Sequence, residues 1–192
     1  MHRHFLIHKP INFVSQFIYP HKRKKGLLGD LYKFPQGTMA IGRLDVKSEG
    51  LLLLTTDGKF SNQVRSKCVE KEYYVQVDGI VTTKETELLK KGVEIGVDGK
   101  KYVAIAKHAS IIDDPNFTNE NIKVRDERHG PTSWLSITIN EGKFRQIRKM
   151  TAAVGLPTLR LVRVRVGHLK IDQFEPGKVI ELCGADIEKF KN

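Results

Sequence analysis

One carboxylate in the sequence stands where a purely structural role is hard to assign. Asp45 lies two residues after Arg43 in the stretch GRLDVKSEGLLLLTTDG, residues 42–58, and shortly before the apolar run LLLL. A buried charge without a partner is costly, so a carboxylate beside buried strands must be paired or hydrogen-bonded. The local spacing leaves two interpretations open. Asp45 either caps the turn through the amides of Lys47 or Ser48, or it takes part in catalysis.

Basic residues free of acidic neighbours are concentrated in two short segments. The chain has 192 residues and a net charge of +11, with 33 Lys and Arg against 22 Asp and Glu. Residues 19–29 and 142–165 contain eleven of these bases and no acid, so the rest of the chain is balanced. This pattern predicts an acidic partner, most simply nucleic acid, bound by both segments. For residues 21–25 taken alone, a solvated loop stays an alternative.

The sequence carries few signs of other chemistry. Its histidines are not accompanied by an HExxH pattern or by carboxylates at ligand spacing, so we expect no metal. Its glycines form neither a P-loop nor a dinucleotide fingerprint, and no GxSxG serine is present. Cys68 and Cys183 stand far apart, outside any CxxC spacing. No apolar run approaches the roughly 20 residues of a membrane helix, and we find no signal peptide. We therefore expect a cytoplasmic protein that does not contact a membrane.

Hydrophobic periodicity and turn residues predict the elements that position Asp45. We expect strands over residues 4–9, 39–44, 50–56, 71–79, near 101–112, over 134–142 and 158–171, and a closing strand near 178–182. We expect helices over 59–67, 82–92 and 144–155 and a short one at the end of the chain, with a long loop over 13–38.

Tight connections between neighbouring strands predict the fold class. We expect an α+β fold with one domain over residues 1–192, in which two lobes share a mostly antiparallel, mixed sheet flanked by helices and loops. In the strand over 71–79, alternation places Tyr73 on the face of Val75 and Val77, and Tyr74 on the other side as a core residue. In the strand over 158–171, alternation predicts that Leu161 points inward while three arginines are exposed, namely Arg160, Arg163 and Arg165.

Five ordered segments resemble the RsuA family of RNA pseudouridine synthases. They are His8-Lys9-Pro10, the stretch over 42–58, Lys71-Glu72-Tyr73-Tyr74-Val75, the run EGKFRQIRKM over 141–150 and LVRVRVG over 161–167. GRLD alone would be weak evidence, but five segments in the family's order are specific. One departure is Asn12, where the family commonly has glycine; asparagine tolerates the same left-handed turn. Most relatives carry a small N-terminal RNA-binding domain before this first segment, and here we expect none before Lys9.

The resemblance implies a role for each matching residue. Asp45 would be the nucleophile, and Tyr73 would pack against a flipped uracil in an active-site cleft across the sheet. Arg148 would pair with Asp45 and orient it, the alternative being a phosphate contact only. Whether the aspartate attacks the sugar or the base, or stabilises a glycal, stays open. Arg43 would enter the RNA stack or contact a phosphate, and Leu161 would line the pocket floor or be a plain core leucine. The other expected RNA contacts are Lys9, Lys22, Arg23, Lys24, Lys25, Arg145, Lys149, Arg163 and Arg165.

The resemblance also implies the substrate class. We expect a uridine in large-subunit (23S) ribosomal RNA, free or in a ribosome assembly intermediate, and a monomeric enzyme. No organic cofactor is expected, because an isomerisation needs no redox step or activated group. The alternatives are a synthase for another rRNA site or a tRNA, and a non-catalytic RNA-binding or ribosome-assembly protein on the same fold. A metal-dependent nuclease, which a chelator would inhibit, is a third possibility.

Overall fold

The structure is a computed structural model that describes residues 2–18, 25–66, 68–117, 129–171 and 175–190. The chain divides into two compact units. Unit 1 comprises residues 1–71 and 162–192, and unit 2 comprises residues 72–161.

Unit 1 contains the whole N-terminal third of the chain and its C-terminal end. Its elements are β1 (His4–Lys9), the 3₁₀ helix η1 (Leu28–Asp30), β2 (Met39–Ala40), β3 (Glu49–Thr55), α1 (Gly58–Arg65), β10 (Leu169–Lys170), β11 (Val179–Glu181) and α4 (Gly184–Glu188). Strand β9 (Thr158–Val166) begins in unit 2 and ends in unit 1.

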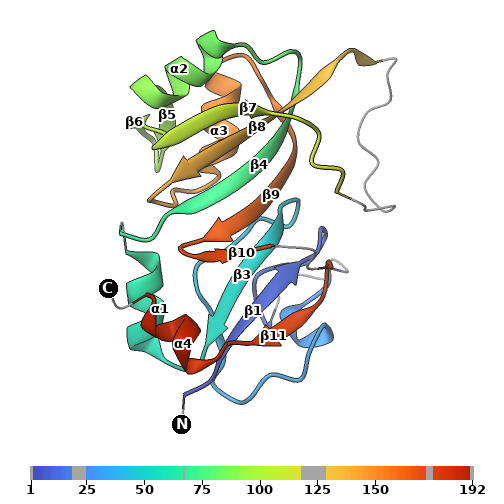
Figure 1. The fold of residues 1–192 in the computed structure, drawn as a ribbon, viewed down its shortest axis with the longest axis vertical. Helices are drawn as coiled ribbons and strands as arrows, with labels where there is room; N and C mark the ends of the chain where they lie inside the picture. The colour runs from blue at the N-terminus through green and yellow to red at the C-terminus, as the bar shows by residue number, and fades with distance from the viewer. Residues whose placement is uncertain (1, 19–24, 67, 118–128, 172–174, 191–192) are drawn as a thin grey trace. The chain divides into compact units, whose positions relative to one another are not determined.

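The strands of unit 1 are arranged around β3, with β1 lying between β11 and β3 (Figure 1). β1 is antiparallel to both neighbours, whereas β3 is parallel to the middle of β9, so the sheet is mixed. All seven residues of β3 are buried, including residues 51–54. Leu51 and Leu53 pack with Phe60 and Val64 of α1, which places an apolar core on that side of the strand.

Close approach of β3 and β9 requires Gly50. Its φ is +104°, and a Cβ there would lie 2.2 Å from the carbonyl oxygen of Arg163. Any other residue at this position would meet backbone, which cannot move aside as a flexible side chain can. The strand that follows Asp45 is therefore held directly against the backbone of its neighbour.

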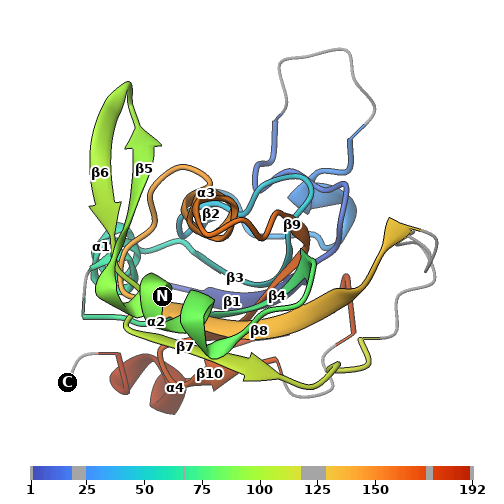
Figure 2. The ribbon, with the colours of Figure 1, turned by 90° about the horizontal axis from the view of Figure 1, so that it is seen from above.

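Unit 2 has its own set of strands and two helices. Its elements are β4 (Lys71–Asp78, whose first residue belongs to unit 1), α2 (Thr83–Lys91), β5 (Val93–Val97), β6 (Lys100–Ala104), β7 (His108–Ile112), β8 (Thr132–Ile139) and α3 (Gln146–Ala153). β8 lies between β4 and β7, and β5 and β6 form a separate two-stranded hairpin. The hairpin projects beside α3, with which β5 is in contact (Figure 2).

Local capping signals explain the best-predicted helix. Thr82 is the N-cap of α2, and its backbone N–H donates to the Glu85 carboxylate at 2.9 Å in a capping box. Gly92 ends the helix with φ of +113°. The predicted helices over 59–67 and 144–155 are also present as α1 and α3, and α4 is the short helix near the end of the chain.

Several sequence expectations need correction. The strand expected over 39–44 is only Met39–Ala40, although the N–H of Ile41 still donates to the carbonyl of Leu53. The strand β5 was not predicted. Tyr74, expected in the core, is half-buried, while Tyr73 is 7% exposed.

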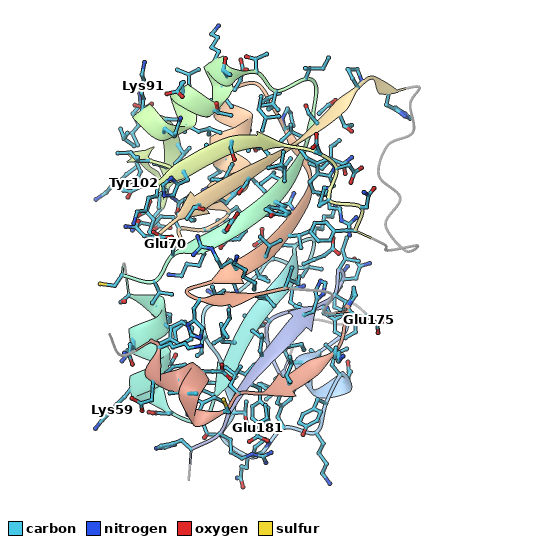
Figure 3. All side chains as sticks on the ribbon, viewed as in Figure 1. Lys59, Glu70, Lys91, Tyr102, Glu175 and Glu181 are labelled. Atoms are coloured by element: carbon cyan, nitrogen blue, oxygen red, sulfur yellow. The ribbon has the colours of Figure 1, made fainter. Side chains whose placement is uncertain are left out.

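The expected exposure of the β9 arginines is wrong. Arg160 and Arg163 are buried, and the side chain of Arg165 is 18% exposed. Each guanidinium has internal partners that make burial possible. The Arg163 Nε donates to the Leu51 carbonyl at 2.6 Å, and Arg160 donates to the Phe117 carbonyl at 3.2 Å. Arg165 pairs with Glu70 at 3.1 Å; Glu70 is labelled in Figure 3.

Candidate active site

The turn that carries Asp45 is fastened on both sides by hydrogen bonds from one loop. The Ser15 Oγ donates to the Leu44 carbonyl and accepts from the Leu44 N–H, each at 2.9 Å. The Asn12 N–H donates to the Val46 carbonyl at 2.8 Å. Both residues that flank Asp45 are therefore attached to residues 12–15, while Asp45 itself is half-buried.

The turn is also closed by its own backbone. The Ser48 N–H donates to the Asp45 carbonyl at 3.0 Å, and β3 begins at the next residue. Ser48 and Glu49 are both buried. The Asp45 carboxylate is thus carried by a backbone with few ways to move, because fixed strands and paired amides surround it.

Lys9 is hydrogen-bonded to the loop that fastens the turn of Asp45. It is fully buried, and its ammonium donates to the carbonyls of Pro10 at 2.7 Å and Phe13 at 2.8 Å. Burial lowers the pKa of Lys9 to about 7, although the nearby carboxylates of Glu49 and Asp45 favour its charged form. The expectation of a direct RNA contact by Lys9 differs from this placement. Its bonds to the loop suit a positioning role.

The other implied catalytic residues belong to unit 2. Tyr73 lies on β4 and is buried. Arg148 lies on α3, is half-buried, and donates to the Thr158 carbonyl at 3.4 Å. The hydroxyls of Thr151 and Thr158 are hydrogen-bonded at 2.7 Å, which fastens α3 to the start of β9. Because Asp45 belongs to unit 1, its pairing with Arg148 and its place beside Tyr73 stay predictions, as does the cleft across the sheet.

The expected RNA-contact residues fall into two groups. Arg43 and Arg145 are exposed, and Lys25 and Lys149 are half-buried. Leu161, Arg163 and Lys9 are buried, so their side chains offer little surface to RNA. Lys22, Arg23 and Lys24 lie outside the described residues.

Two residues that support the site were not found from the sequence. Ser15 acts on Leu44 across 29 positions of the chain, and no local pattern announces such a contact. Glu49 is 1% exposed at the start of β3 and acts electrostatically on Lys9. The position of Glu49 between a polar turn and an apolar run was the one sequence signal that could have indicated a buried carboxylate.

Neither a metal-binding group nor a membrane-spanning helix is found in the parts of the chain that the structure describes. Among the described residues, no three His, Cys, Asp or Glu side chains are grouped so that they could hold a metal ion. Within the same parts of the chain, none of the helices has the length and apolar character needed to cross a membrane.

Comparisons with known proteins agree with this architecture. Residues 3–153 match the family described as RNA pseudouridylate synthase. The chain is 41% identical over 180 residues to the ribosomal large subunit pseudouridine synthase E of Vibrio parahaemolyticus, covering 92% of this chain and 72% of the relative. It is 38% identical to the protein of the same name from Xanthomonas axonopodis pv. citri, covering 89% of each.

A solved structure matches the fold over nearly the whole chain. The crystal structure of a pseudouridylate synthase superimposes with a TM-score of 0.74 at 25% identity, covering 99% of this chain and 74% of the other. The mixed, largely antiparallel sheet is therefore the one expected from the sequence. The chain belongs to the RNA pseudouridylate synthase family and is an RNA pseudouridine synthase, an isomerase.

Proposed function

We propose that the chain isomerises a uridine of large-subunit ribosomal RNA to pseudouridine, with Asp45 as the essential carboxylate. The names of the relatives that are 38–41% identical support the choice of RNA. The single observation that supports the choice of Asp45 is its turn, whose two flanking residues are hydrogen-bonded to residues 12–15.

The proposed reaction rearranges one glycosidic bond. The N1–C1′ bond of the uridine breaks and a C5–C1′ bond forms, while the C5 proton leaves to solvent and N1 gains a proton. The target nucleotide must leave its stack so that the enzyme reaches C1′ and C5. Asp45 acts as the nucleophile or as the electrostatic partner at this centre, and a rigid turn keeps its carboxylate in a productive position.

The unit 2 residues would complete the site. Arg148 pairs with the Asp45 carboxylate in this proposal, since a planar guanidinium orients a carboxylate through directed hydrogen bonds. Tyr73 supplies a ring face for the flipped uracil and a hydroxyl that can move a proton at the sugar. Leu161 forms part of the pocket floor.

Exposed cations would hold the RNA backbone. Arg43, Lys25, Arg145 and Lys149 contact phosphates in this proposal, while Arg163 and Arg165 join β9 to its neighbours in unit 1 through Leu51 and Glu70. Such contacts give affinity that falls with salt and carry no sequence information. The enzyme would work as a monomer without an organic cofactor or a metal ion.

Tritium release tests the proposal. The protein is incubated with large-subunit rRNA, small-subunit rRNA or tRNA transcripts that carry tritium at C5 of uridine. We expect release from the large-subunit transcript alone, unchanged by EDTA. Release from another RNA only would reassign the substrate. A folded protein that binds RNA and releases tritium from no transcript would refute the assignment of this activity.

A further inference from the structure

A large aromatic side chain is exposed at the surface of unit 2. Phe144 is 68% exposed in the turn between β8 and α3, between Lys143 and Arg145, which are also exposed. Burying a phenylalanine stabilises a fold by about 2 kcal/mol, and an exposed phenylalanine does not provide this stabilisation. A polar residue in the turn would avoid exposing an apolar ring to water. Isolated exposed apolar residues are common on proteins, so the surroundings of Phe144 decide its meaning.

The turn beneath Phe144 is rigid because one carboxylate joins it to the β5–β6 hairpin. The Glu141 carboxylate accepts from the Tyr102 hydroxyl at 2.7 Å and from the Gln146 side-chain amide at 2.7 Å. Gln146 is 3% exposed, and its amide oxygen accepts from the Lys143 N–H at 2.9 Å. Tyr102, labelled in Figure 3, therefore links β6 to the turn.

Cations are interleaved with the two aromatic rings. The Lys149 ammonium lies 5.4 Å from the centre of the Phe144 ring and donates to the Gly96 carbonyl of β5. The Lys143 ammonium lies 5.4 Å from the centre of the Tyr102 ring. Both pairs have the geometry of cation–π contacts. Two acids, Glu94 and Asp98, lie on the same hairpin, and Glu94 pairs with Lys101 at 2.9 Å.

The backbone conformation of Arg145 is a further indication that this surface binds a ligand. Arg145 has φ of +54°, a conformation that costs a non-glycine residue about 1 kcal/mol or more. The hydrogen bonds of Gln146 hold the turn in which this residue lies, immediately before α3. A strained, charged residue beside an exposed ring is a feature of binding surfaces, where geometry is kept at a cost in stability.

We propose that residues 141–149 and the β5–β6 hairpin form a docking surface for unpaired nucleotides of RNA. Phe144 is the platform on which a base stacks, and Lys143, Arg145 and Lys149 hold the phosphates on either side. Alternating rings and cations on a rigid support are what a single strand requires, because every base has a stacking face and every nucleotide a charge. A duplex would not use the ring, since its bases are already stacked. This inference rests on the proposed RNA substrate and adds the class of RNA structure that flanks the target.

Substitution of Phe144 separates stacking from charge. Three fluorescein-labelled probes are used in fluorescence anisotropy: a 12-nucleotide oligouridylate, a 12-nucleotide abasic strand with the same phosphates, and a 12-base-pair RNA duplex. We expect Phe144→Ala to weaken oligouridylate binding roughly 5- to 150-fold and to leave abasic-strand and duplex binding unchanged. Phe144→Trp retains the affinity for oligouridylate, whereas Phe144→Leu binds it as weakly as the alanine variant.

The matched control is another exposed apolar residue of unit 2. Ile80 is 67% exposed, and Ile80→Ala should bind all three probes as the wild type does. Oligouridylate affinity of Phe144→Ala within twofold of the wild type, an equal loss on the abasic strand, or full rescue by leucine would each overturn the proposal. Tritium release by the wild type is measured on the same preparation. Oligouridylate binding that depends on Phe144, without tritium release, would refute the proposed function alone. Tritium release, without oligouridylate binding that depends on Phe144, would refute the docking surface alone.

Discussion

Replacing Ser15 by alanine should disturb the position of Asp45 indirectly, through the backbone of Leu44. The Ser15 hydroxyl makes two hydrogen bonds to the backbone of Leu44, both at 2.9 Å, in a place where Ser15 is 6% and Leu44 is 7% exposed. Ser15→Ala leaves a buried N–H and a buried carbonyl without these bonds. Because such a loss costs about 1–3 kcal/mol, we expect the free energy of unfolding to fall by about 2 kcal/mol in urea denaturation.

The same change should slow the reaction more than it weakens RNA binding. The residue before Asp45 is no longer fixed to the loop, and a displacement near 1 Å at a reacting group costs on the order of 100-fold in rate. Since the Asn12 bond to Val46 remains, we expect kcat from tritium release to fall roughly 10- to 100-fold while KM changes little.

Ser133 offers a matched control with the same chemistry in unit 2. Its hydroxyl donates to the Gly79 carbonyl and accepts from the Val81 N–H, which lies 2.8 Å away. Ser133→Ala should cost comparable stability and leave kcat near that of the wild type. If both variants lose similar stability while Ser15→Ala keeps kcat within twofold, the idea that Ser15 positions Asp45 is refuted.

Further predictions concern buried groups of unit 1. The pKa of Lys9 is about 7 in the folded protein and 10.5 ordinarily, so the unfolded chain binds more protons between these values. The contribution of Lys9 to the free energy of unfolding should therefore rise by about 2 kcal/mol between pH 7 and pH 9 and stay nearly constant below pH 7. Urea denaturation of Lys9→Met and the wild type across this range isolates the effect. Free energies of unfolding that depend on pH with the same slope in both proteins would contradict it. Gly50→Ala should cost more than about 3 kcal/mol in thermal or urea unfolding, because its Cβ would meet the Arg163 backbone. Gly37→Ala, with φ of +80° and open space around it, should cost only about 1 kcal/mol, and equal losses would show that φ alone matters.

The sequence predicted those elements whose signals are local. The cap at Thr82 and the stop at Gly92 lie within the segment they delimit, so α2 is found within a residue. The strand β5 was missed because five residues between a helix and a turn carry too little periodicity to stand out. Arg163 was misplaced because alternation shows which residues share a face of a strand, and cannot show that both faces are covered.

The sequence predicted which residues would carry the chemistry of the candidate site, but not which residues hold them in place. The motifs around Asp45, Tyr73 and Arg148 carry the family resemblance, so the residue types could be named from the sequence. The contacts that hold Asp45 come from Ser15 and the loop behind it, and they join residues about 30 positions apart. Such pairings arise from tertiary packing, which no window of sequence reports.

We hold that Asp45 performs an isomerisation on large-subunit rRNA, and a map of pseudouridines in cells is the direct test of this claim. Pseudouridines are mapped in the rRNA of cells that carry the wild-type gene, no gene, or the Asp45→Asn allele, with the variant shown to be folded and to bind RNA. We predict one large-subunit pseudouridine that is present with the wild type and absent in both other strains. Its presence with Asp45→Asn at the wild-type level, or an unchanged large-subunit map after deletion, would contradict the claim.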